Sequence, residues 1–302
     1  MSGYDAGAKG HLTAETAAQV ADAVCSRVGL DPTGLRPLGP VGENASFAVP
    51  HHQVVLRVTS AANTGRVARE ISIAQWLLTE HFPVVRPIRS DLISIDAWVV
   101  SLWEQVPDPS IASTRNLGQL LHQLHGLAPP TEIDLPRLDP LAGVEGYLSA
   151  AHGLDSADVA FLRRRRGELR QAFTELDFTL QPGPVHGDAH RKNVVRGSDG
   201  HVVMLDLERV SCGPREWDLI VAATYADLGW YTPEEYAGFV DAYGADIRDW
   251  SGYATLLEIR KLRMTAWLCA RTGREPRLRA EAAKRIATVR DPALPTAWTP
   301  GV

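Results

Sequence analysis

The sequence predicts an α+β fold in which a strand-rich N-terminal third precedes a mostly helical remainder. Short apolar runs bounded by Gly, Pro and polar residues recur between residues 35 and 103. From residue 110 the spacing changes, and Leu117, Leu120, Leu121 and Leu124 repeat at the interval of a helix that faces a core. One hairpin pattern, at residues 194–205, interrupts the helical part. With 302 residues, the chain is long enough for two domains or one large two-lobed unit.

The N-terminal third is expected to form an antiparallel five-stranded sheet with helices. Thr13 is a suitable N-cap for a helix that Gly29 ends, and a second helix should begin near Thr64. The expected strands are Leu35–Leu38, Ala45–Val49, Val54–Val58, Val84–Ile88 and Trp98–Trp103. Beyond them, helices are expected at residues 144–151, 156–176, 233–243, 251–271 and 276–289.

Composition excludes several classes of protein. The net charge of −5 offers no basic field for nucleic acid, so no nucleic-acid partner is expected. The four arginines of residues 163–166 form either an anion patch or a solvated helix face, and the acidic balance favours the second. No apolar run reaches membrane-spanning length, and the first residues lack the pattern of a signal peptide. We therefore expect a cytoplasmic protein with no membrane partner.

The stretch from Val185 to Leu219 carries the chemistry. Asp188 and Asn193 precede the apolar run Val194-Val195, and Asp206 ends the second run beyond a Ser-Asp-Gly turn. A hairpin would bring these three oxygen-bearing side chains to one end of a small sheet. Phosphoryl transfer uses such a set, because a carboxylate must orient the acceptor hydroxyl and hard oxygen ligands must hold Mg²⁺.

These residues resemble a known family. His-Gly-Asp-x-x-x-x-Asn, an apolar strand ending in Asp, and Gly-x-x-x-x-Asp-Leu resemble the aminoglycoside phosphotransferases and the wider aminoglycoside/choline-kinase-like group. Protein kinases have a similar loop, but Gly187 replaces their Arg, and Asp206-Leu207-Glu208 replaces Asp-Phe-Gly. The resemblance implies a bilobal protein-kinase-like fold, Mg²⁺, ATP or GTP as phosphate donor, and a hydroxylated small molecule as acceptor.

The same resemblance divides the chain. Residues 1–103 would form a nucleotide-covering N-lobe, 104–109 a hinge, and 110–302 a helical C-lobe with the catalytic loop and acceptor site. In the hinge, Glu104 and Val106 are expected beside the nucleotide base. The loop with Gly42 and Asn44 is expected over the phosphates.

Arg57 and Glu70 are the remaining nucleotide-binding candidates. Kinases hold the α- and β-phosphates with a basic residue on the third strand, steadied by a Glu on the next helix. Arg57 stands where Lys is usual, and Arg retains the charge and can grip two phosphate oxygens. The alternative is a surface ion pair with no ligand.

Roles around the catalytic loop follow from the resemblance. Asp188 is the expected catalytic base, with a loop carboxylate that caps local N–H groups as the alternative. Asn193 and Asp206 are the expected Mg²⁺ ligands, and strand alternation would place Glu208 on the same side as Asp206. Two further residues would support the loop: His186 by packing beneath it, and Asp218 by accepting hydrogen bonds from its backbone.

Other side chains near the loop are ambiguous. His190 would brace Asp188, line the acceptor site or lie at the surface, and Lys192 would approach the transferred phosphoryl group or point to solvent. For a polyamine acceptor, carboxylates should line its pocket, with Asp227, Glu234, Glu235 and Glu258 as candidates. The alternative is that these carboxylates lie on solvated helix faces.

The predicted function is therefore a Mg-dependent small-molecule kinase. An aminoglycoside-type antibiotic is the favoured acceptor, which would make antibiotic resistance the biological role. A sugar or an amino alcohol such as choline or ethanolamine is the alternative acceptor. A pseudokinase that binds nucleotide without catalysis is a further alternative, disfavoured because Arg57, Asp188, Asn193 and Asp206 are all present.

Overall fold

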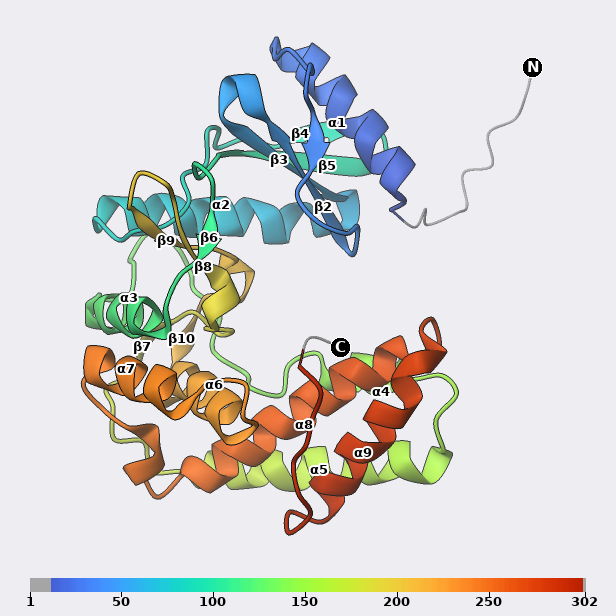
Figure 1. Cartoon of the computed structure of the whole chain (residues 1–302), viewed down its shortest axis with the longest axis vertical. Coiled ribbons are helices and arrows are strands. Elements are labelled where there is room, and N and C mark those ends of the chain that lie inside the picture. Colours follow the sequence, from blue (N-terminus) through green and yellow to red (C-terminus); the bar gives the residue numbers. More distant parts are fainter. Residues whose placement is uncertain (1–11, 301–302) are drawn as a thin grey trace. The chain divides into compact units, whose positions relative to one another are not determined.

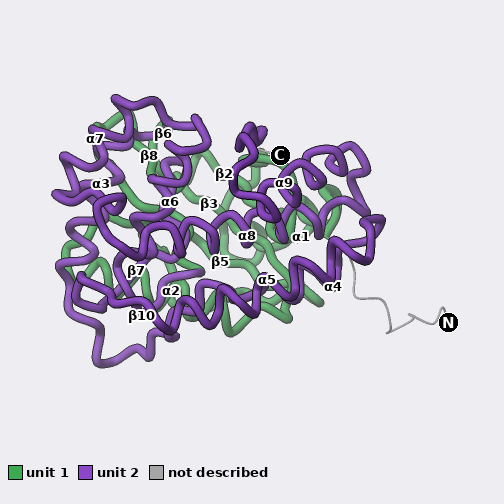
Figure 2. The backbone as a smooth tube through the Cα atoms, turned by 90° about the horizontal axis from the view of Figure 1, so that it is seen from below, with its two compact units in different colours: residues 1–111, 193–208 green, residues 112–192, 209–302 purple. Residues whose placement is uncertain are grey.

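The computed structural model describes residues 12–300, which divide into two compact units (Figure 2). Unit 1 takes the chain up to residue 111 together with residues 193–208, and unit 2 takes residues 112–192 and everything from residue 209 onward. The hairpin that carries Asn193 and Asp206 therefore groups with the N-terminal sheet, although it lies far along the sequence. Within the described residues, no helix is both long and apolar enough to cross a membrane.

Unit 1 is built on the predicted five-stranded antiparallel sheet, in the order β1-β2-β3-β5-β4 (Figure 1). The strands are β1 Arg36–Pro37, β2 Asn44–Val49, β3 Val54–Ser60, β4 Ile93–Ile95 and β5 Trp98–Glu104. Helix α1, Ala14–Val28, packs on this sheet, since its Val20 and Val24 share one buried cluster with Phe47 and Leu56. Thr13 caps its N-terminus, and Gly29 ends it in the left-handed conformation.

The remaining elements of unit 1 position its polar residues. Helix α2, Thr64–Thr79, follows β3 and carries the buried Glu70. A three-stranded sheet, in the order β6-β8-β9, holds the predicted hairpin. Its strands are β6 Ser110–Ile111, β8 Val194–Arg196 and β9 Val202–Met204.

One predicted strand was wrong. Residues 84–88 are not the fourth strand of the large sheet, which is Ile93–Ile95 instead. The segment does run beside β5, because the Ile88 N–H donates to the Leu102 carbonyl at 2.9 Å. Pro83 and Pro87 have no N–H to donate, so a regular ladder cannot continue through them.

Unit 2 is mostly helical, as predicted (Figure 1). Its helices are α3 Thr114–Gly126, α4 Val144–Ser149, α5 Ser156–Thr174, α6 Glu216–Asp227, α7 Pro233–Tyr243, α8 Tyr253–Arg271 and α9 Arg279–Arg290. One buried cluster joins five of them, through residues such as Leu148, Leu162, Trp217, Leu262 and Ile286. Strands β7, Gly183–Val185, and β10, Ser211–Gly213, pair antiparallel at the two ends of the segment that carries the motif.

Candidate active site

A cavity of about 700 Å³ in unit 1 collects most of the residues predicted to bind nucleotide. Its polar lining includes Arg57, Glu70, Asn193 and Asp206. Apolar side chains from the strands and the connecting segment complete it, among them Val55, Val106 and Leu205. A cavity with an apolar part and a few convergent charges suits a planar base joined to phosphates.

Arg57 lies on β3, the central strand of the sheet, and its Nη1 is 2.7 Å from the Oε1 of Glu70 on α2. Glu70 is only 4% exposed. Burial raises the pKa of Glu70, and the nearby Arg57 guanidinium only partly opposes this. Glu70 is buried and Arg57 is half-buried at the cavity, so the pair is not a surface ion pair. Glu70 holds the Arg57 guanidinium in place, and Arg57 keeps its charge.

Asn193 and Asp206 line the same cavity at the two ends of the hairpin. Asp206 follows β9 at a φ of 61°, and its Oδ1 is buried with no hydrogen-bond partner among residues 12–300. The Leu205 N–H donates to the Asn193 carbonyl at 2.8 Å, which ties the two ends together. A buried carboxylate oxygen without a donor is costly unless a cation meets it, so these oxygens fit a Mg²⁺ ion.

Among the described residues, no group of three or more His, Cys, Asp or Glu is placed to hold a metal ion. An ion held by Asn193 and Asp206 would therefore complete its shell with phosphate oxygens and water, which is the usual arrangement for Mg²⁺ in nucleotide sites.

Glu208 does not lie on a strand, so strand alternation does not determine its position. Strand β9 ends at Met204, and Leu207–Arg209 form a 3-10 helix. Glu208 lies 3.7 Å from Arg57 Nη2 and 3.5 Å from Arg66 Nη1. It is therefore a second carboxylate near Arg57.

The other nucleotide candidates lie as follows. Asn44, Glu104 and Val106 line the cavity of unit 1. Gly42 does not, and its N–H donates to the carbonyl of Asn44 at 3.1 Å. Their contacts with a nucleotide stay predictions.

The catalytic loop belongs to unit 2 and is anchored by Asp218 of α6. The carboxylate of Asp218 is fully buried and accepts hydrogen bonds from the backbone N–H groups of His186, at 2.6 Å, and Gly187, at 2.8 Å. His125 Nε2 lies 3.1 Å from the same carboxylate. His186 is also fully buried, and its Nδ1 accepts from the Asp188 N–H at 3.3 Å. The loop backbone is thus fixed from His186 up to Asp188.

Gly187 has a φ of 84°, where a side chain is strained. A Cβ on Gly187 would also lie 2.4 Å from the carbonyl oxygen of Arg209. Both facts explain why this loop has Gly where the protein kinase loop has Arg.

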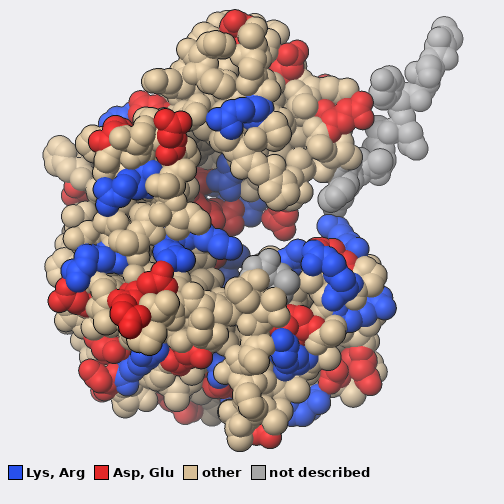
Figure 3. All heavy atoms as spheres, in the orientation of Figure 1, with Lys and Arg blue, Asp and Glu red and all other residues tan. Residues whose placement is uncertain are grey.

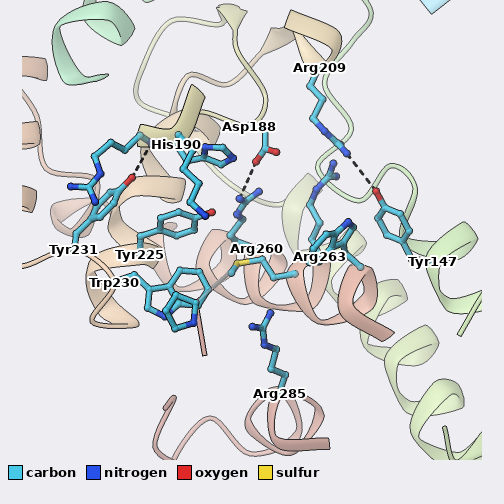
Figure 4. Close-up of a pocket in the computed structure, with 15 residues that line it drawn as sticks. Tyr147, Asp188, His190, Arg209, Tyr225, Trp230, Tyr231, Arg260, Arg263 and Arg285 are labelled. Carbon is cyan, nitrogen blue, oxygen red and sulfur yellow. Dashed lines mark hydrogen bonds and ion pairs between the residues drawn. The ribbon is translucent and has the colours of Figure 1, made fainter. Parts of the chain in front are cut away.

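A second cavity, of about 480 Å³, surrounds Asp188 in unit 2 (Figure 4). Arg260, from the middle of α8, reaches up to the loop, and its Nη2 donates to Asp188 Oδ1 at 2.9 Å. Burial alone would raise the pKa of Asp188, but Arg260 and the neighbouring His190 and Arg209 lower it to about 2. Asp188 is therefore ionised across the whole physiological range.

Aromatic side chains form one wall of this cavity. His190 stacks on Tyr225, with ring centroids 6.2 Å apart, and Tyr231 accepts a hydrogen bond from the Arg191 N–H at 3.0 Å. Burial lowers the pKa of His190, although Asp188 opposes this, so its ring is neutral near pH 7. His190 thus lines the cavity, as one of the sequence alternatives proposed.

The sequence pattern described as the phosphotransferase enzyme family matches residues 35–256 of this chain. The chain belongs to that family. The resemblance to the aminoglycoside phosphotransferases that the motif predicted is confirmed, and so is the α+β, protein-kinase-like fold. The protein is a small-molecule phosphotransferase. No match was found among curated proteins.

Solved structures of this phosphotransferase's relatives agree with it in fold. A structure of the amicoumacin kinase hAmiN in complex with AMP-PNP, Ca²⁺ and Ami has a TM-score of 0.69 at 15% identity, covering 92% of this chain and 95% of that one. A microcompartment-associated aminopropanol kinase has a TM-score of 0.68 at 17% identity, covering 90% and 94%. A choline/ethanolamine kinase family protein from Mesorhizobium loti has a TM-score of 0.61 at 18% identity, covering 92% and 96%.

In this phosphotransferase, the carboxylates predicted to line an acceptor pocket do not line the cavity around Asp188. Asp227 pairs with Arg248, Glu235 with Arg191, and Glu258 with Lys261. Glu234 is exposed in the first turn of α7. These residues therefore fit the alternative of solvated helix faces, and their spacing along the chain does not reveal their basic partners.

Sequence reasoning also missed Arg260, the ion-pair partner of Asp188. The two residues are 72 positions apart, and Arg260 sits within an ordinary helical pattern. An Arg flanked by the apolar residues of a buried helix face is the one local signal that could have drawn attention to it.

Proposed function

We propose that this phosphotransferase transfers the γ-phosphoryl group of ATP or GTP to a hydroxyl group of a small molecule, with Mg²⁺. The observation that carries the proposal is the cavity of unit 1, where the Arg57–Glu70 pair lies with Asn193 and Asp206. A nucleoside triphosphate needs a fixed positive charge for its phosphates, which Arg57 supplies. Its metal ion needs hard oxygen ligands, which Asn193 and Asp206 supply.

In this proposal Arg57 binds phosphate oxygens of the nucleotide and Glu70 holds Arg57 in place. Asn193 and Asp206 would hold Mg²⁺, which neutralises charge on the phosphates when bound. The relative in complex with AMP-PNP and Ca²⁺ supports a nucleotide and a divalent cation as partners. A nucleotide donor also fits the cytoplasmic location that the sequence predicts.

Asp188 acts on the acceptor. The hydroxyl oxygen attacks the γ-phosphorus, the bond to the bridging oxygen breaks, and the nucleoside diphosphate leaves. A carboxylate with a pKa of about 2 is a weak base. Its main work is to orient the hydroxyl, and it takes up the proton only late, as the bond to phosphorus forms.

The second part of the proposal is the chemical class of the acceptor. Relatives include kinases whose names specify amicoumacin, aminopropanol and choline or ethanolamine. An aminoglycoside-type antibiotic, the acceptor favoured from the sequence, remains within this range, and antibiotic resistance would follow from it. The alternatives are a sugar or an amino alcohol.

A nucleotide-consumption screen against antibiotics, sugars, sugar acids and amino alcohols tests the proposal. Wild-type protein should consume ATP or GTP with some acceptor, and Asp188→Ala should lower that turnover by orders of magnitude. Asp241→Asn is the matched control, because Asp241 is an exposed carboxylate on α7 paired with Arg115. Nucleotide binding without consumption in any reaction would favour the pseudokinase, and wild-type turnover in Asp188→Ala would remove Asp188 from its role.

A further inference from the structure

The cavity around Asp188 is strongly basic. Among the described residues that line it, six are Arg or Lys and Asp188 is the single acidic one (Figure 4). The basic residues are Arg191, Lys192, Arg209, Arg260, Arg263 and Arg285. The chain as a whole has a net charge of −5, and on the face drawn in Figure 3 basic and acidic side chains are interspersed. The positive charge is therefore a local property of this cavity.

Carboxylates near the cavity balance only part of this charge. Arg191 pairs with Glu235, and Arg285 pairs with Glu281 at 2.9 Å. Asp188 pairs with Arg260, and the charge of Arg209 also lowers the pKa of Asp188.

Arg263 is the clearest case of uncompensated charge. It is 8% exposed, and its Nη1 donates to the backbone carbonyls of Pro140 and Ala142, both at 3.1 Å. Carbonyl groups satisfy the N–H bonds but carry no net charge. A guanidinium buried on such terms is costly, and an anion in the cavity would lower that cost.

Two buried polar atoms in the same cavity have no hydrogen-bond partner among residues 12–300. They are Arg260 Nε and His190 Nδ1. Arg260 is 5% exposed, so its Nε cannot easily turn to bulk water. Buried polar groups are normally hydrogen-bonded, so these two atoms have hydrogen-bonding capacity left for a ligand.

We propose that the acceptor carries an anionic group, a carboxylate or a phosphate, beside the hydroxyl that is phosphorylated. Arg263 and Lys192 would attract the anion, while Asp188 orients the hydroxyl. The aromatic wall, with Tyr225 and Trp230, would pack on the acceptor's ring or apolar face. The inference rests on the proposed phosphoryl transfer. It disfavours a polyamine acceptor, because like charges brought together in one cavity repel.

A matched set of sugars tests the charge of the acceptor directly. Glucose, glucuronate, glucose 6-phosphate and glucosamine share a ring and differ in charge. Binding is followed by tryptophan fluorescence, and turnover by nucleotide consumption. We expect at least one anionic sugar to bind about tenfold more tightly than glucose and glucosamine to bind more weakly than glucose. Equal binding of all four, or preference for glucosamine, would overturn the inference. The two anions separate carboxylate from phosphate recognition.

Variants locate the effect. Arg263→Gln and the exposed Lys192→Gln should each weaken binding of the preferred anion about tenfold and leave glucose binding unchanged. Arg274→Gln removes the same charge from the segment after α8, outside the cavity. It should change neither the binding of the anion nor the binding of glucose. Should the two cavity variants instead raise the KM of the nucleotide, their charges serve the transferred phosphoryl group, and the inference fails.

The outcomes also separate this inference from the proposed function. Phosphorylation of a cationic acceptor with the best kcat/KM would leave the kinase proposal standing and end this one. Tight binding of anionic sugars, with no nucleotide consumed by any acceptor tested, would count against phosphoryl transfer while the anion site stood.

Discussion

The guanidinium of Arg260 lies 2.9 Å from the carboxylate of Asp188 and joins helix α8 to the catalytic loop. The Arg260 side chain is 6% exposed, so the pair is largely shielded from water and salt. It fixes the carboxylate in place and in its ionised form. The pair therefore favours an orienting role for Asp188 over early removal of a proton.

Replacing Arg260 should shift the pH dependence of the reaction. In the wild type, the pKa of Asp188 is about 2 against an ordinary 3.8, so Asp188 stays ionised well below pH 4. In Arg260→Gln the burial of Asp188 is less opposed and its pKa rises. We expect the acidic limb of the pH profile of kcat/KM to move up by about one unit or more.

Arg260→Lys is the control, because it retains a charge near Asp188 and should show a smaller shift. Stability gives a second readout. The depressed pKa adds stability above about pH 4 that is lost as the pH falls toward 2. Acid unfolding of Arg260→Gln should lack this component, and identical pH profiles in all three proteins would argue against the ion pair in solution.

Asp206→Asn should separate stability from function. The buried Oδ1 of Asp206 has no described hydrogen-bond partner, and Glu70 and Glu208 are nearby acidic groups. Asn relieves that charge and tolerates a positive φ. We expect thermal stability without nucleotide to be unchanged or higher, while Mg-dependent nucleotide affinity falls at least about tenfold.

Titration calorimetry of the nucleotide, with and without Mg²⁺, measures this affinity. Asp199→Asn, on the turn of the same hairpin, is the matched control and should bind as wild type does. Unchanged Mg-dependent affinity in Asp206→Asn would exclude Asp206 as a metal ligand.

Glu70→Gln should weaken nucleotide binding through Arg57. The 2.7 Å ion pair positions the guanidinium, and an amide holds it less strongly. We expect the KM of the nucleotide to rise about tenfold and the KM of the acceptor to stay constant. Glu80→Gln, just beyond the end of α2, should leave both values unchanged. A rise in the acceptor KM alone would contradict the assignment.

Gly187→Ala should unfold or strongly destabilise the catalytic loop. The new Cβ would lie 2.4 Å from a carbonyl oxygen at a φ of 84°. We expect a loss of about 2 kcal/mol or more in the free energy of unfolding, together with lost turnover. Gly167→Ala is the comparison, because its Cβ has open space within α5 and should stabilise the helix by about 0.5–1 kcal/mol. Equal denaturation midpoints for the two variants would contradict this view of Gly187.

Local sequence patterns were enough to predict many of the helices and turns of this protein. The capping of α1 by Thr13 and Gly29, the hairpin around residues 198–200 and the helical spacing of unit 2 were readable because each depends on residues close in the chain. The motif from His186 to Asp218 was readable for the same reason, and it indicated the family correctly.

Other features were decided only when distant segments met. The fourth strand, Ile93–Ile95, pairs with residues 98–100 of β5, whereas residues 84–88 meet β5 farther along, at Leu102 and Glu104. Glu208 pairs with Arg57 and Arg66 because the chain turns into a 3-10 helix after Asp206. Arg260, the partner of Asp188, and two further basic residues that line its cavity, Arg263 and Arg285, come from α8 and α9, late in the chain. Spacing in the sequence reports neighbours along a strand or helix. The charge of a cavity depends on which side chains from separate elements find partners there, and only tertiary packing settles that.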